Sequence, residues 1–164
     1  MGQSLYQPRL VESCSTMAQT LELTENVEMY LKYIYLLAER GGGRAKTGEI
    51  SQYLKVAPSS VTEMLERLQD SGLTRYEKYR GAALTKRGRD IAVRILRRHC
   101  TMEYFLVQVL GVPDGRYHDE ACEMEHVLSD DTAQRLRRLI DQPKTCPDCY
   151  ELANLHCKHL VAKR

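Results

Sequence analysis

A nine-residue segment in the second half of the chain concentrates side chains that bind transition metals. It reads His-Asp-Glu-Ala-Cys-Glu-Met-Glu-His and starts at residue 118. On an α-helix, which turns about 100° per residue, positions four, seven and eight residues after the first share one face. A helix that packs on its neighbours would carry Leu or Val on that face. Imidazole, thiolate and carboxylate together suit first-row transition metals better than calcium or magnesium. The ligands predicted here are His118, Cys122, Glu125 and His126.

A second pair of potential ligands precedes this segment. His99 and Glu103 are four residues apart, so on a helix they share a face. In isolation, such a pair is most often an ion pair on a helix surface. Beside the ligand-rich segment, we interpret it as part of a second metal site.

The C-terminal tail holds a third group of metal-binding residue types. A Cys-x-x-Cys pair is followed within ten residues by a further cysteine and two histidines. This spacing indicates a zinc knuckle, although it is shorter than that of most zinc fingers. Redox-active or free thiols are the alternative interpretation. The residues concerned are Cys146, Cys149, His156, Cys157 and His159.

The first half of the chain has the pattern of three helices. Residues 1–23 show no sustained apolar period, and we expect a flexible N-terminal arm. From Thr24 apolar residues recur at helical spacing until three glycines from Gly41 end the helix. A short helix follows, for which Thr47 is a suitable cap. A third helix begins with Pro58 at its first position and ends at Gly72.

The next stretch changes to a strand pattern. Two short segments between Leu73 and Thr85 flank the sequence Lys-Tyr-Arg-Gly, which starts at Lys78. This pattern predicts a two-stranded hairpin with a basic tip. Helix, turn, helix and basic hairpin make up a winged helix, whose last helix enters the DNA major groove while the wing follows the phosphates.

Polar residues on the exposed side of the third helix and on the wing are the predicted DNA contacts. Short polar side chains near the amino end of a recognition helix reach base edges or donate to phosphates, and basic side chains on the wing neutralise phosphates. Helix capping is the alternative role of the two serines. The predicted contacts are Pro58, Ser59, Ser60, Thr62, Glu63, Lys78 and Arg80, with Lys86, Arg87 and Arg89 as further phosphate contacts.

The second half of the chain is also predicted to be helical. A long helix starts near Lys86 and breaks before Pro113, and two helices follow over 117–128 and 130–140, the latter opened by Ser129. The predicted fold class is therefore mainly α: a winged helix-turn-helix DNA-binding domain plus a helical metal-binding and dimerisation domain. The expected divisions are 1–23, 24–95, 96–142 and the Cys/His-rich tail 143–164.

Charge and composition agree with this division. Residues 24–98 hold 15 Lys and Arg against 9 Asp and Glu, whereas residues 99–164 hold 8 against 11. A basic half suits phosphate contact and an acidic half suits cation binding, although charge blocks are often only solvated faces. The chain shows no apolar run long enough for a membrane span and no signal peptide. We therefore expect a cytoplasmic protein whose six cysteines are thiols or metal ligands rather than disulfides.

Three segments resemble one known family. VAPSSVTEMLERL (56–68) and YEKYRGAALTKRG (76–88) are similar to the winged helix of the diphtheria toxin repressor family, especially its manganese transport regulator branch. HDEACEMEHVLSD (118–130) resembles the metal motif of the same family. The resemblance implies one site made of His99, Glu103 and His118. It implies a second site made of Met29, Cys122, Glu125 and His126.

The implied ligands also bear on the choice of metal. Manganese regulators of this family have carboxylates where this chain has Met29 and Cys122, whereas the iron regulators have Met and Cys. Sulfur donors favour iron(II), cobalt(II) or nickel(II) over manganese(II), so iron(II) is the predicted effector and manganese(II) the alternative. Many members carry a third, SH3-like domain, for which too few residues follow Ile140.

The resemblance implies a homodimeric repressor of metal-uptake genes that binds a palindromic operator. Dimerisation is expected from the helices after Ile95, with Phe105, Leu106 and Val109 as apolar candidates. We do not expect an enzyme, because the predicted ligands fill their sites without an obvious general base or open position. The alternatives are a manganese-responsive regulator of the same family, or a metal-binding enzyme or metal buffer that includes a winged helix.

Overall fold

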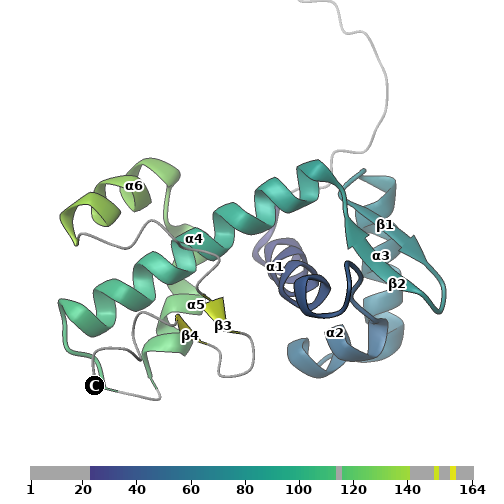
Figure 1. Ribbon diagram of the computed structural model, residues 1–164, viewed down its shortest axis with the longest axis horizontal. Helices are drawn as coiled ribbons and strands as arrows, with labels where there is room; N and C mark the ends of the chain where they lie inside the picture. The colour runs from purple at the N-terminus through teal and green to yellow at the C-terminus, as the bar shows by residue number, and fades with distance from the viewer. Residues whose placement is uncertain (1–22, 114–115, 141–149, 152–155, 158–164) are drawn as a thin grey trace, which may run out of the picture.

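The computed structural model describes residues 23–113, 116–140, 150–151 and 156–157. One long helix, α4, connects a winged-helix half to a smaller helical half (Figure 1). The predicted mainly α fold class is confirmed. In chain order the elements are α1 (Glu25–Arg40), α2 (Thr47–Leu54), α3 (Pro58–Asp70), β1 (Thr74–Glu77), β2 (Gly81–Leu84), α4 (Lys86–Gln108), α5 (Tyr117–Val127), α6 (Asp130–Leu139), β3 (Tyr150–Glu151) and β4 (His156–Cys157).

The helix ends of the first half follow from local chemistry. Thr24 caps α1, because its hydroxyl oxygen accepts a hydrogen bond from the Val27 N–H. Pro58 occupies the first turn of α3, and Gly72 follows the helix with a φ of 68°. The predicted capping role of Thr47 is wrong: Thr47 is already helical and Lys46 is the N-cap residue.

The wing is an antiparallel hairpin in which Thr74 pairs with Leu84 and Glu77 with Gly81. It is tied to the loop before α2 by two hydrogen bonds between the backbones of Ala45 and Ala82, at 2.8 and 2.9 Å. Only glycine fits at position 81, because a Cβ there would lie 2.3 Å from the Ala45 carbonyl oxygen. The wing therefore has a fixed orientation relative to α2.

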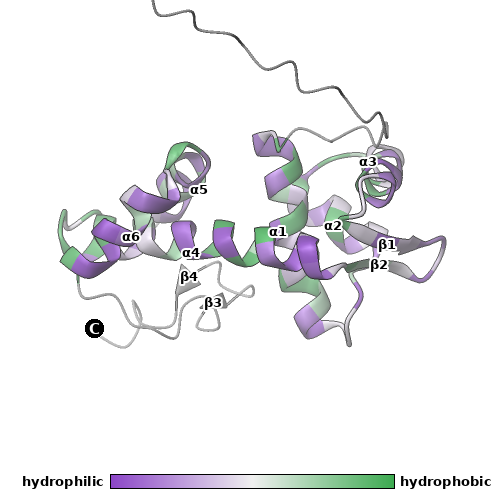
Figure 2. Ribbon diagram, turned by 90° about the horizontal axis from the view of Figure 1, so that it is seen from above, coloured by the Kyte–Doolittle hydropathy of each residue, from purple (hydrophilic) through white to green (hydrophobic). Residues whose placement is uncertain are grey.

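Helix α1 is the centre of the larger core. Its apolar face, green in Figure 2, buries Leu31 and Ile34. They belong to the same buried cluster as Leu65 of α3 and Ile95 of α4, and each such side chain contributes about 1.5–3 kcal/mol when buried. This core continues along α4 past Ile95. The expected division after residue 95 therefore falls inside one continuous helix.

A second, smaller core lies in the other half. Met102 and Leu106 of α4 pack there with Ala121 of α5. Arg98 Nη2 binds Asp130 Oδ1 at 2.8 Å and so connects α4 to the start of α6, which Ser129 caps as predicted. Leu106 is 3% exposed, so its predicted role as a dimer contact is wrong. It is already buried within its own chain.

Three of the predicted features lie partly or wholly outside the described residues. These are the N-terminal arm, the tail residues Cys146, Cys149 and His159, and the side chains of His156 and Cys157. The backbone of 156–157 forms β4, which pairs with β3 and contacts α4. No described helix is long and apolar enough to cross a membrane.

Candidate metal centre and nucleic-acid interface

The predicted ligands of α4 and α5 meet in the interior of the smaller half. His99, Glu103 and Glu125 are fully buried. The ring of His99 lies between the two carboxylates: its Nε2 is 3.1 Å from Glu103 Oε1 and its Nδ1 is 2.6 Å from Glu125 Oε2. His118 Nδ1 approaches the same Glu103 oxygen at 3.0 Å. Helical spacing thus aligned the ligands on each helix, and the packing of α5 on α4 brings the two rows together.

Cys122 adds a sulfur donor to this group. Its Sγ lies 3.6 Å from His118 Nε2 and 3.8 Å from His99 Nδ1. The donor atoms of His99, His118 and Cys122 all lie within 4.8 Å of one another. Three donors at such mutual distances can bind one ion. The two sites implied by the family resemblance are therefore parts of one connected cluster.

Helix α1 reaches the cluster through two residues that were not predicted as part of it. Glu28 Oε2 lies 2.7 Å from His126 Nδ1, and Lys32 Nζ lies 2.7 Å from Glu125 Oε1. Glu28 and Lys32 are four positions apart on one helix face. The sequence did contain a signal, since two charged residues at this spacing interrupt an apolar helix.

Met29 takes a different position. It lies one residue after Glu28, about 100° further around α1, and lines a surface hollow with Tyr30, Leu54 and Val56. The structure thus brings together His99, Glu103, His118, Cys122, Glu125 and His126. The role of Met29 as a ligand stays a prediction.

The cluster shifts the acid–base properties of its members. Burial lowers the pKa of His118, but hydrogen bonds with Cys122 and Glu103 outweigh this effect and raise it to about 9. His126 likewise has a pKa of about 9, because Glu125 and Glu28 outweigh burial. Burial raises the pKa of the Cys122 thiol, yet hydrogen bonds with His118 and His99 bring it down to about 6. Near neutral pH the cysteine is therefore a thiolate beside protonated histidines.

The donor set fits a divalent transition metal. Within the described chain, Glu103 Oε2 is buried without a hydrogen-bond partner, and an anionic oxygen in that position is costly unless a cation compensates it. Nitrogen, sulfur and oxygen donors surround the same space. His99, Glu103, His118, Cys122, Glu125 and His126 would hold the ion.

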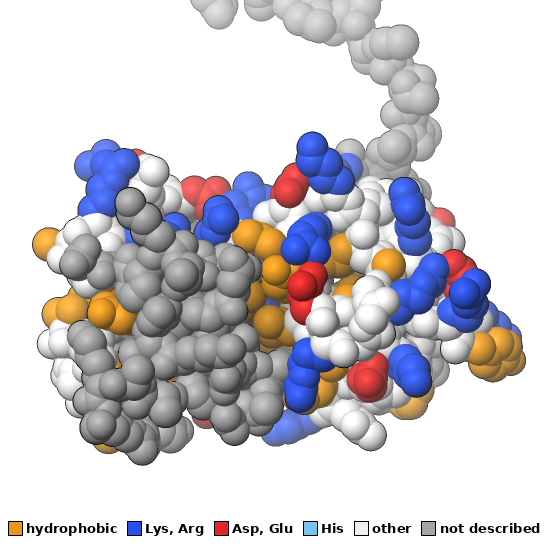
Figure 3. All heavy atoms as spheres, in the orientation of Figure 1, with side chains coloured by type: hydrophobic (Ala, Val, Ile, Leu, Met, Phe, Trp, Pro, Cys, Tyr) orange, Lys and Arg blue, Asp and Glu red, His pale blue; other side chains and the backbone are white. Residues whose placement is uncertain are grey.

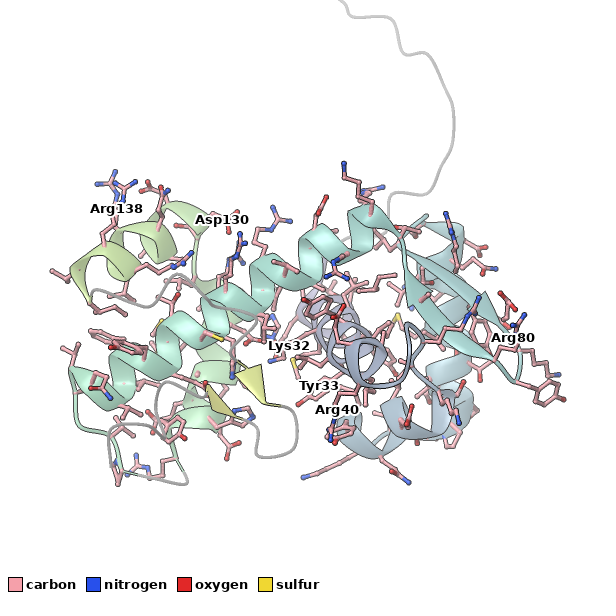
Figure 4. All side chains as sticks on the ribbon, in the orientation of Figure 1. Lys32, Tyr33, Arg40, Arg80, Asp130 and Arg138 are labelled. Carbon is pink, nitrogen blue, oxygen red and sulfur yellow. The ribbon has the colours of Figure 1, made fainter. Side chains whose placement is uncertain are left out.

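The predicted DNA-contact surface lies at the other end of the molecule. At the start of α3, Pro58, Ser59, Ser60 and Glu63 are exposed, whereas Thr62 is half-buried and donates its hydroxyl to the Pro58 carbonyl at 3.1 Å. Figure 3 shows Lys and Arg side chains spread over this half, and Figure 4 places Arg80 at the tip of the wing. The arrangement presents α3 and the wing on the outside of the winged-helix half.

Two features of this surface were not predicted. Tyr79 at the wing tip is 90% exposed and has a φ of 67°. Lys46, Thr47 and Gly48 at the start of α2 line a hollow together with Thr62 and Lys78. Backbone N–H groups at a helix start favour phosphate, so the start of α2 extends the basic surface.

In this fold the first helix of a winged helix contacts a cluster of candidate metal ligands. This combination is typical of one class of protein, the metal-dependent DNA-binding regulators. Comparison with known proteins places the chain within it. Residues 22–82 match the family described as iron dependent repressor, N-terminal DNA binding domain. Residues 85–151 match the family described as iron dependent repressor, metal binding and dimerisation domain. The chain belongs to the iron-dependent repressor family, which includes the diphtheria toxin repressor.

Individual relatives include regulators of different metals. The chain is 37% identical to an HTH-type transcriptional regulator of Methanocaldococcus jannaschii, over 74% of this chain and 98% of that one. It is 36% identical to the iron-dependent repressor IdeR of Mycobacterium tuberculosis, over 77% of this chain but only 54% of that one. The structure of the manganese regulator SloR aligns with a TM-score of 0.65 at 35% identity, over 76% of this chain and 58% of that one. The chain thus spans about half the length of several relatives.

Proposed function

We propose that this protein is an iron(II)-responsive transcriptional regulator that binds a palindromic operator as a homodimer and represses metal-uptake genes. The observation that carries the proposal is the contact of Glu28 with His126, which joins the winged-helix half to the ligand cluster. Through it, ligand geometry on α5 and the position of α1 depend on each other. Manganese(II) in place of iron(II) is the second candidate.

The coupling runs through side chains of α1. Leu31 and Ile34 fix α1 in the core of the winged-helix half, while Glu28 extends from the same helix to His126. A bound divalent metal supplies positive charge that holds the carboxylates, thiolate and imidazoles of α4 and α5 together. Glu28 then orients His126 from outside, as carboxylates commonly do for ligating histidines. A change at the ligands therefore reaches the helix on which α2, α3 and the wing pack.

Cys122 supports iron(II) over manganese(II). Its thiolate lies among the imidazoles of His99 and His118, and a soft sulfur donor favours iron(II), cobalt(II) or nickel(II). Met29, which lines a hollow with Tyr30 and Leu54, is proposed as the second sulfur ligand. The relatives named for both metals leave the choice to experiment.

The proposed contacts with DNA and with a second copy of the chain are chosen because their side chains are exposed. Ser59, Ser60, Glu63 and Thr62 would face the major groove from α3, next to Pro58, with Lys78 and Arg80 on the phosphates. Exposed apolar residues of the smaller half supply a surface for a second copy. They are Val109, Leu110, Val127 and Leu139.

Two parts of the proposal rest on sequence alone. The tail residues Cys146, Cys149, His156, Cys157 and His159 are proposed to hold zinc. Action in the cytoplasm follows from a role on DNA. The proposed regulation by the ligand cluster depends on neither of them.

The proposal is tested by a metal titration of DNA binding. A labelled duplex is first selected from a random pool with the metal-loaded protein, and its affinity is then measured anaerobically with iron(II), with manganese(II) and with a chelator. Iron(II) should strengthen binding at least about fivefold, the low end of typical coupling, at lower concentration than manganese(II). DNA affinity that is the same in all three conditions would refute the proposal. Activation by manganese(II) alone would favour the second candidate.

A further inference from the structure

Lys32 of α1 places a buried ammonium group inside the ligand cluster. Its side chain is 1% exposed, and its Nζ lies 2.7 Å from Glu125 Oε1 and 3.7 Å from Cys122 Sγ. Figure 4 shows Lys32 in the middle of the molecule, where α1 meets the half that contains α5. A buried ammonium group is stable only beside anions. Both anionic partners of Lys32 are ligands of the proposed metal site.

The ammonium group and a divalent metal would need the same donor atoms. Glu125 Oε1 faces Lys32 on one side and His126 Nε2, at 3.2 Å, on the other. A metal held by Glu125 and Cys122 would therefore meet a positive charge at hydrogen-bond distance from one of its own ligands. Like charges so close in a buried site repel strongly. The two cations are therefore expected to compete for these donors.

We propose that Lys32 is an internal competitor of the metal: its ammonium group occupies Glu125 and Cys122, weakens metal binding, and leaves these donors when the metal binds. This inference rests on the proposed function, whose metal site it deepens. Lys32 sets the metal concentration at which the protein responds. Because it belongs to α1, its departure also changes the contact of α1 with α5.

The test compares Lys32→Met with Lys55→Met, which removes an exposed lysine at the C-terminal end of α2. Cobalt(II) affinity is measured by competition with a chelator. Binding at Cys122 is taken from the part of the thiolate-to-cobalt absorption band that is lost in Cys122→Ser, because the tail cysteines are also proposed to bind metal. Lys32→Met should bind cobalt(II) at least about tenfold more tightly than wild type, because the repulsion is removed. Lys55→Met should stay within about twofold of the wild-type affinity, since an exposed charge is screened. Equal or weaker binding by a folded Lys32→Met protein would overturn the inference.

If Lys32→Met does not fold, a second variant and a measurement on the wild type test the same inference. Lys32→Gln retains a hydrogen-bond donor for Glu125 without the charge, and the same gain in cobalt(II) affinity is expected. In the wild type, acetylation of Lys32 by acetic anhydride, followed by mass spectrometry, should increase severalfold on cobalt(II) addition, whereas that of the exposed Lys55 should not. Unchanged Lys32 labelling would overturn the inference.

The outcomes separate this inference from the function on which it rests. If the wild type shows no cobalt(II) band, the metal site and the competition both fail. If wild type and variants bind cobalt(II) equally and all respond to it on DNA, the regulator stands and only the competition by Lys32 is refuted.

Discussion

Glu28 and His126 are 98 positions apart in the sequence, yet their Oε2 and Nδ1 atoms lie 2.7 Å apart. One belongs to the first helix of the winged-helix half and the other to the last turn of α5. Both side chains are largely buried, so their contact is little screened by solvent. It connects the first helix of the winged-helix half directly to a histidine of the candidate metal site.

Substitution of Glu28 should separate metal binding from DNA binding. In Glu28→Gln, cobalt(II) still has its ligands, but the charged contact with His126 is lost, and outer partners of ligands typically contribute tenfold or more. We expect the metal-induced gain in DNA affinity to fall at least about fivefold, measured by fluorescence anisotropy. Glu25→Gln, exposed on the same helix, is the matched control. An undiminished metal response in Glu28→Gln would show that this contact carries no coupling.

Substitution of Cys122 should change the choice of metal. Cys122→Glu replaces the soft donor with a hard one, so its affinity for cobalt(II) relative to manganese(II) should fall at least about tenfold, as measured by chelator competition. Met29→Leu should alter metal affinity less, since Met29 lines a hollow beside Leu54. The double variant Met29→Asp/Cys122→Glu should prefer manganese(II) most. Unchanged preference in Cys122→Glu would contradict the argument for iron(II).

Metal binding should depend on pH in a defined direction. The pKa values of His118 and His126 are raised to about 9, so both rings hold a proton at pH 7 that the metal must displace. Cobalt(II) affinity should therefore rise between pH 7 and pH 9, by up to about tenfold per pH unit for each proton released. The gain should cease above the histidine pKa. Isothermal titration calorimetry in two buffers counts the protons, and affinity that falls over this range would contradict the histidine assignment.

Substitutions on the DNA side should divide into two kinds. Lys78→Ala and Arg80→Ala should weaken binding to all duplexes alike. Each should reduce by about one the slope of the logarithm of DNA affinity against the logarithm of salt concentration. Ser60→Ala should instead change the preferred sequence, at about 1–3 kcal/mol per affected base pair. Competition assays with single-base variants of the selected duplex distinguish the two. A salt slope that stays constant in both wing variants would remove the wing from the interface.

Much of the fold follows directly from local patterns. Pro58 and Gly72 mark the ends of α3, and Ser129 marks the start of α6, because each residue has a conformational preference that acts within a few positions. The cap of α2 was missed because Lys46 has no such preference: its own N–H donates to the Glu49 carboxylate at 3.0 Å.

The candidate site was predictable along each helix but not between helices. The spacing from His118 to His126 placed four ligands on one face, and the structure confirms that this face turns toward His99 and Glu103. Which residues of α1 would meet them depends on the rotation of α1 against α5. A sequence pattern cannot supply that rotation, and for this reason the contacts of Glu28 and Lys32 with the cluster were not predicted.

Whether a predicted dimer contact is exposed also depends on how the helices pack. Leu106 lies in the last turn of α4 and Val109 is the C-cap residue three positions later, yet Leu106 lies in the core with Met102 while Val109 is 54% exposed. The side of α4 covered by α5 decides between them. Apolar periodicity identified this face but not the element that covers it.

We propose that metal occupancy and DNA binding are linked, and such a linkage must be reciprocal. The direct measurement is the cobalt(II) affinity of the wild type with and without a saturating amount of the selected duplex. We predict that the duplex strengthens cobalt(II) binding by the same factor by which cobalt(II) strengthens DNA binding. A cobalt(II) affinity that the duplex leaves unchanged would contradict the account.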